Sequence, residues 1–173
     1  MIKKGGRPVV KHLIVVLMVI VNCMLAFTPY AEAAKYLGNI PGIVTKVYDG
    51  DTLTLQNNNG VYKIRLAGID APEKRQAYGS KAQEYLYRMV KDKFVYVVVQ
   101  DKDRYGRYVG KIMVNDIDAN AEMLRAGFAW HYKKYDNNPV YSRIEMEARK
   151  SKVGLWSDKN PIPPWVYRKN KVH

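Results

Sequence analysis

The sequence predicts an α+β fold in which a small β-barrel of five strands is accompanied by three helices. Five short runs rich in β-branched and aromatic residues, separated by turn-forming residues, predict the strands. Three other segments predict helices, from the spacing of their apolar residues or from capping residues at their ends. The single cysteine, Cys23, lies near the N-terminus, so the domain has to be stabilised by its core without disulfides.

The first 33 residues have the pattern of a cleaved secretion signal. Basic residues precede an apolar run over 13–27, and Ala31-Glu32-Ala33 has the small-x-small form of a signal-peptidase site. The alternative is an uncleaved membrane anchor, because the run is not far short of the about 18 to 20 apolar residues that span a bilayer. We expect a signal peptide over 1–33 and a secreted protein, either periplasmic or extracellular.

The remaining 140 of the 173 residues are enough for one domain with a single core. We expect a short lead-in over 34–41, the folded domain over 42–156 and a basic C-terminal tail over 157–173. The tail holds three prolines and a tryptophan close together. It is therefore predicted to be an extended segment whose aromatic residues pack near the barrel.

The first three strands are expected to form a meander. Runs with β-strand composition cover 43–48, 52–55 and 61–66. Strong turn formers separate them, Asp-Gly-Asp at 49–51 and Asn-Asn-Asn-Gly at 57–60.

A helix is predicted next, over 79–92, because its apolar residues recur at the spacing of one helix face. These residues are Ala82, Leu86, Met89 and Val90. Strands over 94–100 and 108–114 follow, separated by a polar turn over 101–107. Five such strands are able to close a small barrel, which has no free edge.

Two more helices complete the predicted fold. Asp118 is expected to cap a short helix that runs through Leu124 and ends at Gly127. Asn138-Pro139 supplies a cap and a first-turn proline for the last helix, which Gly154 is expected to end.

The net charge restricts the class of partner. The whole chain carries +13, and removing the four basic residues and one acid of the signal lowers this to +10. Such an excess attracts polyanions through a long-range field that salt screens. Outside the cytoplasm these are nucleic acids, anionic cell-wall polymers or membrane surfaces, and charge alone does not choose among them.

Acidic residues in two tight turns are candidates for a metal site. Asp51 lies in the first turn, and Asp70 and Glu73 lie in the second. A hard cation such as Ca²⁺ binds several oxygens, which carboxylates on neighbouring turns supply. Each turn alone is more often structural, since Asp-Gly is a common hairpin connection. Arg65 and Arg107 favour the functional interpretation, because a guanidinium binds a phosphate through two parallel hydrogen bonds.

Four spaced blocks resemble the signature of the staphylococcal-nuclease (thermonuclease) family, in the expected order. The blocks are Asp49-Gly50-Asp51-Thr52, Arg65-Leu66, Asp70-Ala71-Pro72-Glu73 and Asp103-Arg104-Tyr105-Gly106-Arg107. The resemblance extends over about residues 42–156. It implies an OB-fold barrel with three helices, Ca²⁺-dependent cleavage of single- and double-stranded nucleic acid, and products that end in a 3′-phosphate.

The same resemblance implies a calcium site. Asp51 and Asp70 would be its carboxylate ligands, and the main-chain carbonyl of Ala71 would be a third oxygen. The best-studied member of the family has Thr at this last position, but a main-chain ligand tolerates Ala.

The resemblance also implies catalytic roles. Arg65 would contact the scissile phosphate, and Arg107 would stabilise the transition state and the departing oxygen. Glu73 would be the candidate general base for the attacking water, a role that suits a carboxylate, and the alternative is that it only positions this water. Tyr105, next to Arg107, is a candidate substrate contact. His131 is expected to be packed or hydrogen-bonded rather than catalytic.

Two alternatives stay open beside a nuclease acting on DNA and RNA. One is a non-catalytic OB-fold module that binds nucleic acid. The other is a basic protein that adheres to the cell envelope through its charge. A degenerate copy is expected to lack at least one of the five charged residues with assigned roles, and all five are present. We expect a monomer, and the sequence leaves open DNA against RNA preference, and endonucleolytic against exonucleolytic cleavage.

Overall fold

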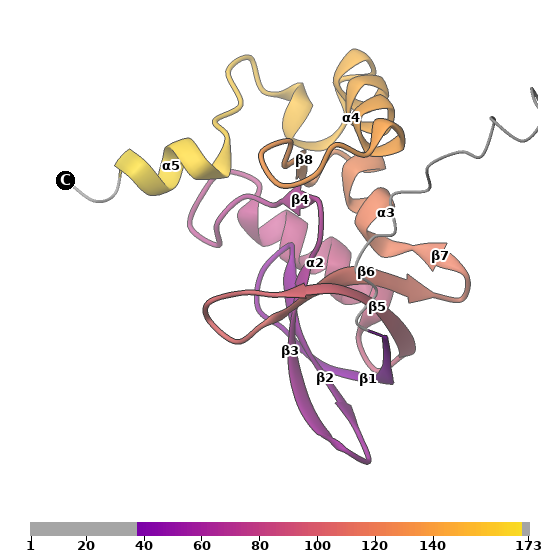
Figure 1. Cartoon of the computed structure of the whole chain (residues 1–173). Coiled ribbons are helices and arrows are strands. Elements are labelled where there is room, and N and C mark those ends of the chain that lie inside the picture. Colours follow the sequence, from indigo (N-terminus) through magenta and orange to yellow (C-terminus); the bar gives the residue numbers. More distant parts are fainter. Residues whose placement is uncertain (1–37, 171–173) are drawn as a thin grey trace, which may run out of the picture. The chain divides into compact units, whose positions relative to one another are not determined.

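The computed structural model describes residues 38–170, and it confirms the predicted five-stranded OB-fold barrel (Figure 1). The strands follow the order β3-β2-β1-β5-β6, and a parallel pairing of β3 with β6 closes the barrel. Antiparallel pairings join all other neighbours. The barrel strands are β1 (Asn39–Val47), β2 (Thr52–Asn57), β3 (Gly60–Leu66), β5 (Phe94–Lys102) and β6 (Tyr108–Val114).

Three further strands of two residues each were not predicted. These are β4 (Ile69–Asp70), β7 (Ile117–Asp118) and β8 (Trp130–His131). Two residues are too few to show an alternating pattern, so the sequence carries no periodic signal for them. The antiparallel pair of β4 with β8 places Asp70 opposite Trp130 and so fixes the backbone of one predicted site residue.

The three predicted helices are present as α2 (Gly79–Val90), α3 (Ala119–Arg125) and α4 (Pro139–Lys150). Both predicted caps form, since the Asp118 side chain accepts from Ala121 N and the Asn138 side chain accepts from Val140 N.

Two predictions about the C-terminal part were wrong. α4 ends at Lys150, and Gly154 instead begins a short 3₁₀ helix, η1 (Gly154–Ser157). The tail is not entirely extended, because it contains a further helix, α5 (Pro164–Asn170). Proline favours the first position of a helix, where its missing N–H is not needed, and neither Pro nor Gly occurs in the six residues that follow Pro164.

The core lies inside the barrel and under α2, α3 and α4. α2 buries Ala82, Leu86 and Val90 on the predicted face, and Met89 is partly buried beside them. A second, smaller cluster joins Trp130 of β8 to Trp156 of η1, whose rings meet edge to face at 4.4 Å between centroids. Trp165 of α5 packs against this cluster. The smaller cluster therefore connects the C-terminal segment to β8.

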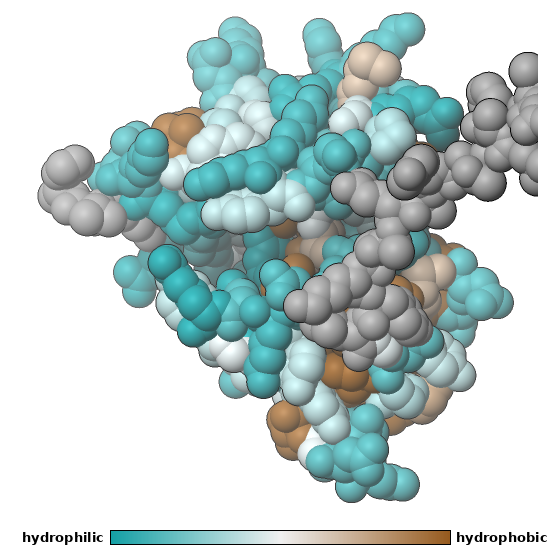
Figure 2. All heavy atoms as spheres, in the orientation of Figure 1, coloured by the Kyte–Doolittle hydropathy of each residue, from teal (hydrophilic) through white to brown (hydrophobic). Residues whose placement is uncertain are grey.

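Hydrophilic residues dominate the face of the molecule in Figure 2, and apolar residues form separate patches on it. Among residues 38–170, no helix has the length and apolar character needed to cross a membrane. The predicted signal peptide and its alternative, a membrane anchor, both concern residues outside this range. The signal peptide therefore stays a prediction.

Candidate active site

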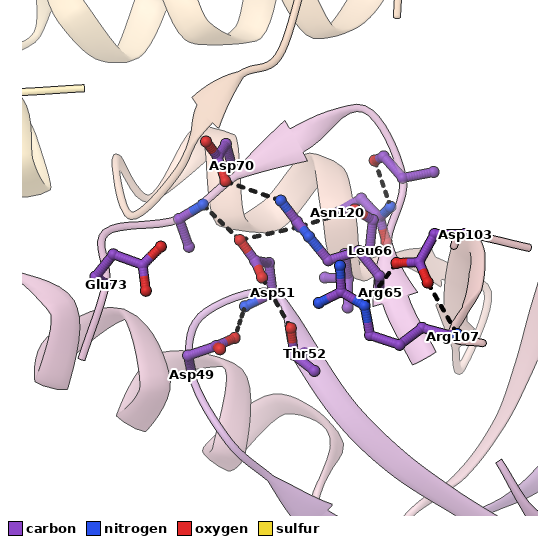
Figure 3. Close-up of polar contacts among 12 residues, drawn as sticks. Asp49, Asp51, Thr52, Arg65, Leu66, Asp70, Glu73, Asp103, Arg107 and Asn120 are labelled. Carbon is purple, nitrogen blue, oxygen red and sulfur yellow. Dashed lines mark hydrogen bonds and ion pairs between the residues drawn. The ribbon is translucent and has the colours of Figure 1, made fainter. Parts of the chain in front are cut away.

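Three predicted site residues form one buried ion-pair cluster at the end of the barrel (Figure 3). Arg65 Nη1 lies 2.9 Å from Asp51 Oδ2, and Arg65 Nη2 donates to Asp70 Oδ1 at 2.9 Å. The side chain of Asp70 is 1% exposed, that of Asp51 9% and that of Arg65 13%. One guanidinium therefore bridges the two carboxylates that the sequence assigned to a metal site.

Backbone pairing brings these three residues together. Arg65 lies opposite Thr52 in the β2–β3 register, and Leu66 N donates to Asp51 O at 2.8 Å. The Asp51 side chain accepts from Ala71 N at 2.7 Å and from Thr52 Oγ1 at 3.1 Å. The turn after β1 and the segment after β4 are thus held to each other by the Asp51 carboxylate.

A third acid, Asp49, adds negative charge to this cluster. Its Oδ1 accepts from Asp51 N at 3.0 Å within the tight turn. Burial, and after it the charge of Asp51, raises the pKa of Asp49 to about 7. Burial likewise raises the pKa of Asp70, although the hydrogen bond from Arg168 opposes the change. Burial therefore disfavours the charged forms of Asp49 and Asp70 more than the other acids of the cluster do.

The donor set fits a hard cation. Among residues 38–170, no three His, Cys, Asp or Glu side chains are grouped to hold a metal ion. Asp51 and Asp70, with the main-chain carbonyl of Ala71, offer oxygen atoms only, which Ca²⁺ accepts while it keeps several waters as further ligands. A divalent cation bound here would favour the charged forms of Asp49 and Asp70, and so would lower the pKa values that burial raises.

Glu73 lies beside the cluster and is more accessible than the two aspartates. Its side chain is 38% exposed, and in Figure 3 its carboxylate points toward the side where Asp51 lies. Its backbone N–H donates to Gln76 Oε1 at 3.1 Å. This exposure suits a group that exchanges a proton with water better than a buried ligand.

Arg107 belongs to a different local structure, the loop between β5 and β6. Its Nε donates to Asp103 Oδ2 at 2.7 Å, while Asp103 Oδ1 accepts from the backbone N–H groups of Tyr105 and Arg107. Burial alone would raise the pKa of Asp103, but these hydrogen bonds outweigh burial and lower the pKa below its usual range. In Figure 3 the Arg107 guanidinium points from this loop toward the side of the cluster where Arg65 lies.

The other two residues considered in the sequence, Tyr105 and His131, differ in their exposure. Tyr105 is 69% exposed, and the guanidinium carbon of Arg107 lies 5.7 Å from its ring centroid. His131 is buried, with Nε2 2.9 Å from Asp136 Oδ1 and Nδ1 3.0 Å from Ser142 Oγ. Tyr105 is therefore accessible to a ligand, and His131 is packed and hydrogen-bonded as expected.

Two residues of the site region were assigned no role from the sequence. Asn120 is fully buried; its amide accepts from Ile112 N at 3.1 Å and donates to Ala67 O at 2.8 Å, which fixes the chain just after Arg65. Arg168 of α5 contacts both Asp70 and Glu73. Arg168 lies 98 residues from Asp70 in the sequence, so no local sequence pattern predicts this contact.

Comparisons with known proteins agree with this geometry. The family model of the staphylococcal nuclease homologues matches residues 63–158. An uncharacterized endonuclease of Escherichia coli is 42% identical over 134 residues, which cover 77% of this chain and 88% of that protein. One of Haemophilus influenzae is 42% identical over 129 residues, 74% of this chain and 72% of that protein.

A staphylococcal-like nuclease of Arabidopsis thaliana is 46% identical over 110 residues, 64% of this chain but only 34% of that longer protein. The closed barrel, the charged cluster and these matches all point the same way, and the chain belongs to the staphylococcal nuclease family.

Proposed function

We propose that this protein is a secreted, calcium-dependent nuclease that hydrolyses phosphodiester bonds in DNA and RNA and leaves 3′-phosphate ends. The observation that carries the proposal is the buried cluster in which Arg65 bridges Asp51 and Asp70. Glu73 lies beside this cluster, and the Arg107 loop faces it (Figure 3). The relatives from Escherichia coli and Haemophilus influenzae are named endonucleases, which supports cleavage within a strand.

The charged residues divide the work of hydrolysis. Glu73 accepts a proton from the attacking water, whose oxygen forms a bond to phosphorus while the bond from phosphorus to the 5′ oxygen breaks. Arg65 and Arg107 neutralise the charge that develops on the phosphoryl oxygens and on the leaving oxygen. Asp51, Asp70 and the Ala71 carbonyl would hold a calcium ion, which would supply Lewis-acid polarisation of the phosphate.

The nucleic-acid strand binds beside exposed aromatic and basic side chains. Tyr105 is exposed next to Arg107, and an aromatic ring beside basic side chains suits stacking on bases. Without residues 1–33 the chain carries a net charge of +10, which attracts the phosphate backbone without regard to its sequence. Secretion is proposed from the pattern of residues 1–33 alone, and we propose a monomer.

Incubation of the purified protein with single-stranded DNA, double-stranded DNA and RNA tests the proposal. We expect degradation on a gel when Ca²⁺ is present and none after chelation, with products that a phosphatase specific for 3′ ends can dephosphorylate. Activity that persists in a chelator would overturn the calcium assignment. Binding of nucleic acid without cleavage in Ca²⁺ would favour the non-catalytic module instead.

The role of Glu73 has its own test. We expect Glu73→Gln to lower kcat by a factor on the order of 10² to 10⁴, because the amide cannot accept the proton. The calcium affinity measured by calorimetry is expected to change little, since Glu73 is assigned to the water and not to the metal. A parallel collapse of calcium binding would show that Glu73 is a ligand.

A further inference from the structure

The C-terminal segment is held against the site by contacts that do not involve Arg168. Gln76 Nε2 donates to Ile162 O at 2.6 Å, and Tyr167 Oη donates to Arg75 O at 3.0 Å. Both partners lie in the loop that follows Glu73. The loop is therefore hydrogen-bonded both to α5 and to the segment before it.

Aromatic stacking holds the first turn of α5. The ring of Trp165 is stacked on Tyr132 with centroids 5.3 Å apart and planes 5° apart. It also meets Trp130 edge to face at 5.6 Å. Trp130 is the residue that pairs with Asp70 across β4 and β8. α5 is thus docked on the strand pair that carries the predicted metal ligand.

Docking in this position brings the Arg168 guanidinium onto two acids of the site. Arg168 Nη2 donates to Asp70 Oδ2 at 2.8 Å and Nη1 donates to Asp70 Oδ1 at 3.3 Å. Nη1 also donates to Glu73 Oε1 at 2.7 Å. Because Arg65 donates to Asp70 Oδ1, both carboxylate oxygens of Asp70 are occupied by arginines.

A cation and Arg168 compete for the same oxygens. A metal ion bound to Asp70 would share with Arg168 the two oxygens that Arg168 now contacts, and a dication beside an unmoved guanidinium is repelled. Arg65 is fixed within the barrel at 13% exposure, whereas the Arg168 side chain is 43% exposed at the rim. Arg168 is therefore the arginine that can leave, since its long side chain is able to turn toward water.

We propose that Arg168 is an internal counter-cation of the active site, which calcium displaces from Asp70 when it binds. The inference rests on the calcium site of the proposed function. Its consequence is that α5 lowers the calcium affinity of the protein, because each binding event first breaks the contacts of Arg168 with Asp70 and Glu73. A tail that only stabilises the fold has no such effect on the metal.

Calorimetric titration of the full-length protein with Ca²⁺ alone tests the exchange, without substrate or turnover. We expect Arg168→Ala to bind calcium on the order of tenfold more tightly than the wild type. Arg168→Lys keeps the charge but loses the two-pronged contact, so its affinity is expected between the two. The matched control is Lys169→Ala, which removes the same charge from the neighbouring exposed position of α5 and is expected to leave the affinity within about twofold.

A second variant separates release of the side chain from a general loss of charge. Trp165→Ala removes the stacking on Tyr132 and is expected to raise calcium affinity in the same direction as Arg168→Ala. The double variant is expected to gain little more than Arg168→Ala alone, because both changes remove the same contact.

The outcomes distinguish the inference from the proposed function. Calcium binding by the wild type with an unchanged or weaker affinity in Arg168→Ala would overturn the inference alone. An equal gain in Lys169→Ala would also overturn it, since the effect would then be general electrostatics. Absence of calcium binding in the wild type and in every variant would overturn both the inference and the calcium dependence.

Discussion

The two arginines proposed to act on the phosphate are held in different ways. Arg65 lies within the barrel wall, pairs with two buried aspartates and is 13% exposed. Arg107 lies in a loop, pairs with one aspartate four residues before it, and both partners are at least 20% exposed. The comparison shows that one site uses two kinds of support: pairing among several strands, and a single turn.

This difference predicts how stability and activity are coupled. Removing Arg65 leaves Asp51 and Asp70 buried without the cation between them, so the fold and the chemistry suffer together. The Arg107 pair is local and partly exposed, and such pairs contribute little to the free energy of unfolding. Mutations of Arg65 and of Arg107 are therefore expected to differ more in their effect on the free energy of unfolding than in their effect on the cleavage rate.

The largest expected effect is that of Arg65→Ala. We expect loss of measurable turnover and a decrease of about 3 kcal/mol in the free energy of unfolding, because two buried carboxylates lose their shared partner. Urea unfolding followed by tryptophan fluorescence measures the stability. An unfolding free energy within about 0.5 kcal/mol of the wild type would show that the cluster does not support the barrel.

Arg107→Lys is expected to separate the two properties. The lysine keeps the charge but loses the planar fork, so kcat is expected to fall by a factor on the order of 10² to 10³. The melting temperature is expected to stay close to that of the wild type, because the loop contributes few buried contacts. Near-normal turnover would remove Arg107 from the transition-state assignment.

The smallest expected effect is that of Asp103→Asn, and it depends on pH. The folded protein lowers the pKa of Asp103, so its carboxylate stabilises the fold above the ordinary unfolded value and this contribution is lost as pH falls through the lowered value. We expect Asp103→Asn to lose less than about 1 kcal/mol at pH 7, because solvent screens the pair. Unfolding curves at several pH values are expected to show this difference shrinking below about pH 4, and a constant difference would contradict the pairing.

The barrel and the three central helices were predictable because their signals are local. Alternating strands, turn residues at 49–51 and 57–60, and the Asp118 and Asn138 caps are each readable within a few residues. The pair β4–β8 and the helix α5 were not predictable in this way. The strands β4 and β8 are too short to show an alternating pattern. The prolines before α5 predict an extended segment, although the helix begins at Pro164.

The residues of the site were predictable from spaced motifs, but their contacts were not. The motifs named Asp51, Arg65 and Asp70, and the structure brings all three together. The pairing of Arg107 with Asp103 and the approach of Arg168 to Asp70 depend on side-chain geometry and on packing of distant segments. Motif spacing contains neither kind of information.

The most direct test of the central claim compares two calcium titrations of the wild-type protein. One follows single-turnover cleavage of a labelled single-stranded DNA, and the other follows calcium binding by calorimetry in the presence of an uncleavable DNA analogue. If the cluster of Asp51 and Asp70 holds the catalytic ion, the cleavage rate starts near zero in chelator and reaches half its maximum at the calcium concentration that half-saturates binding. A cleavage rate that does not change across the calcium titration would contradict the account.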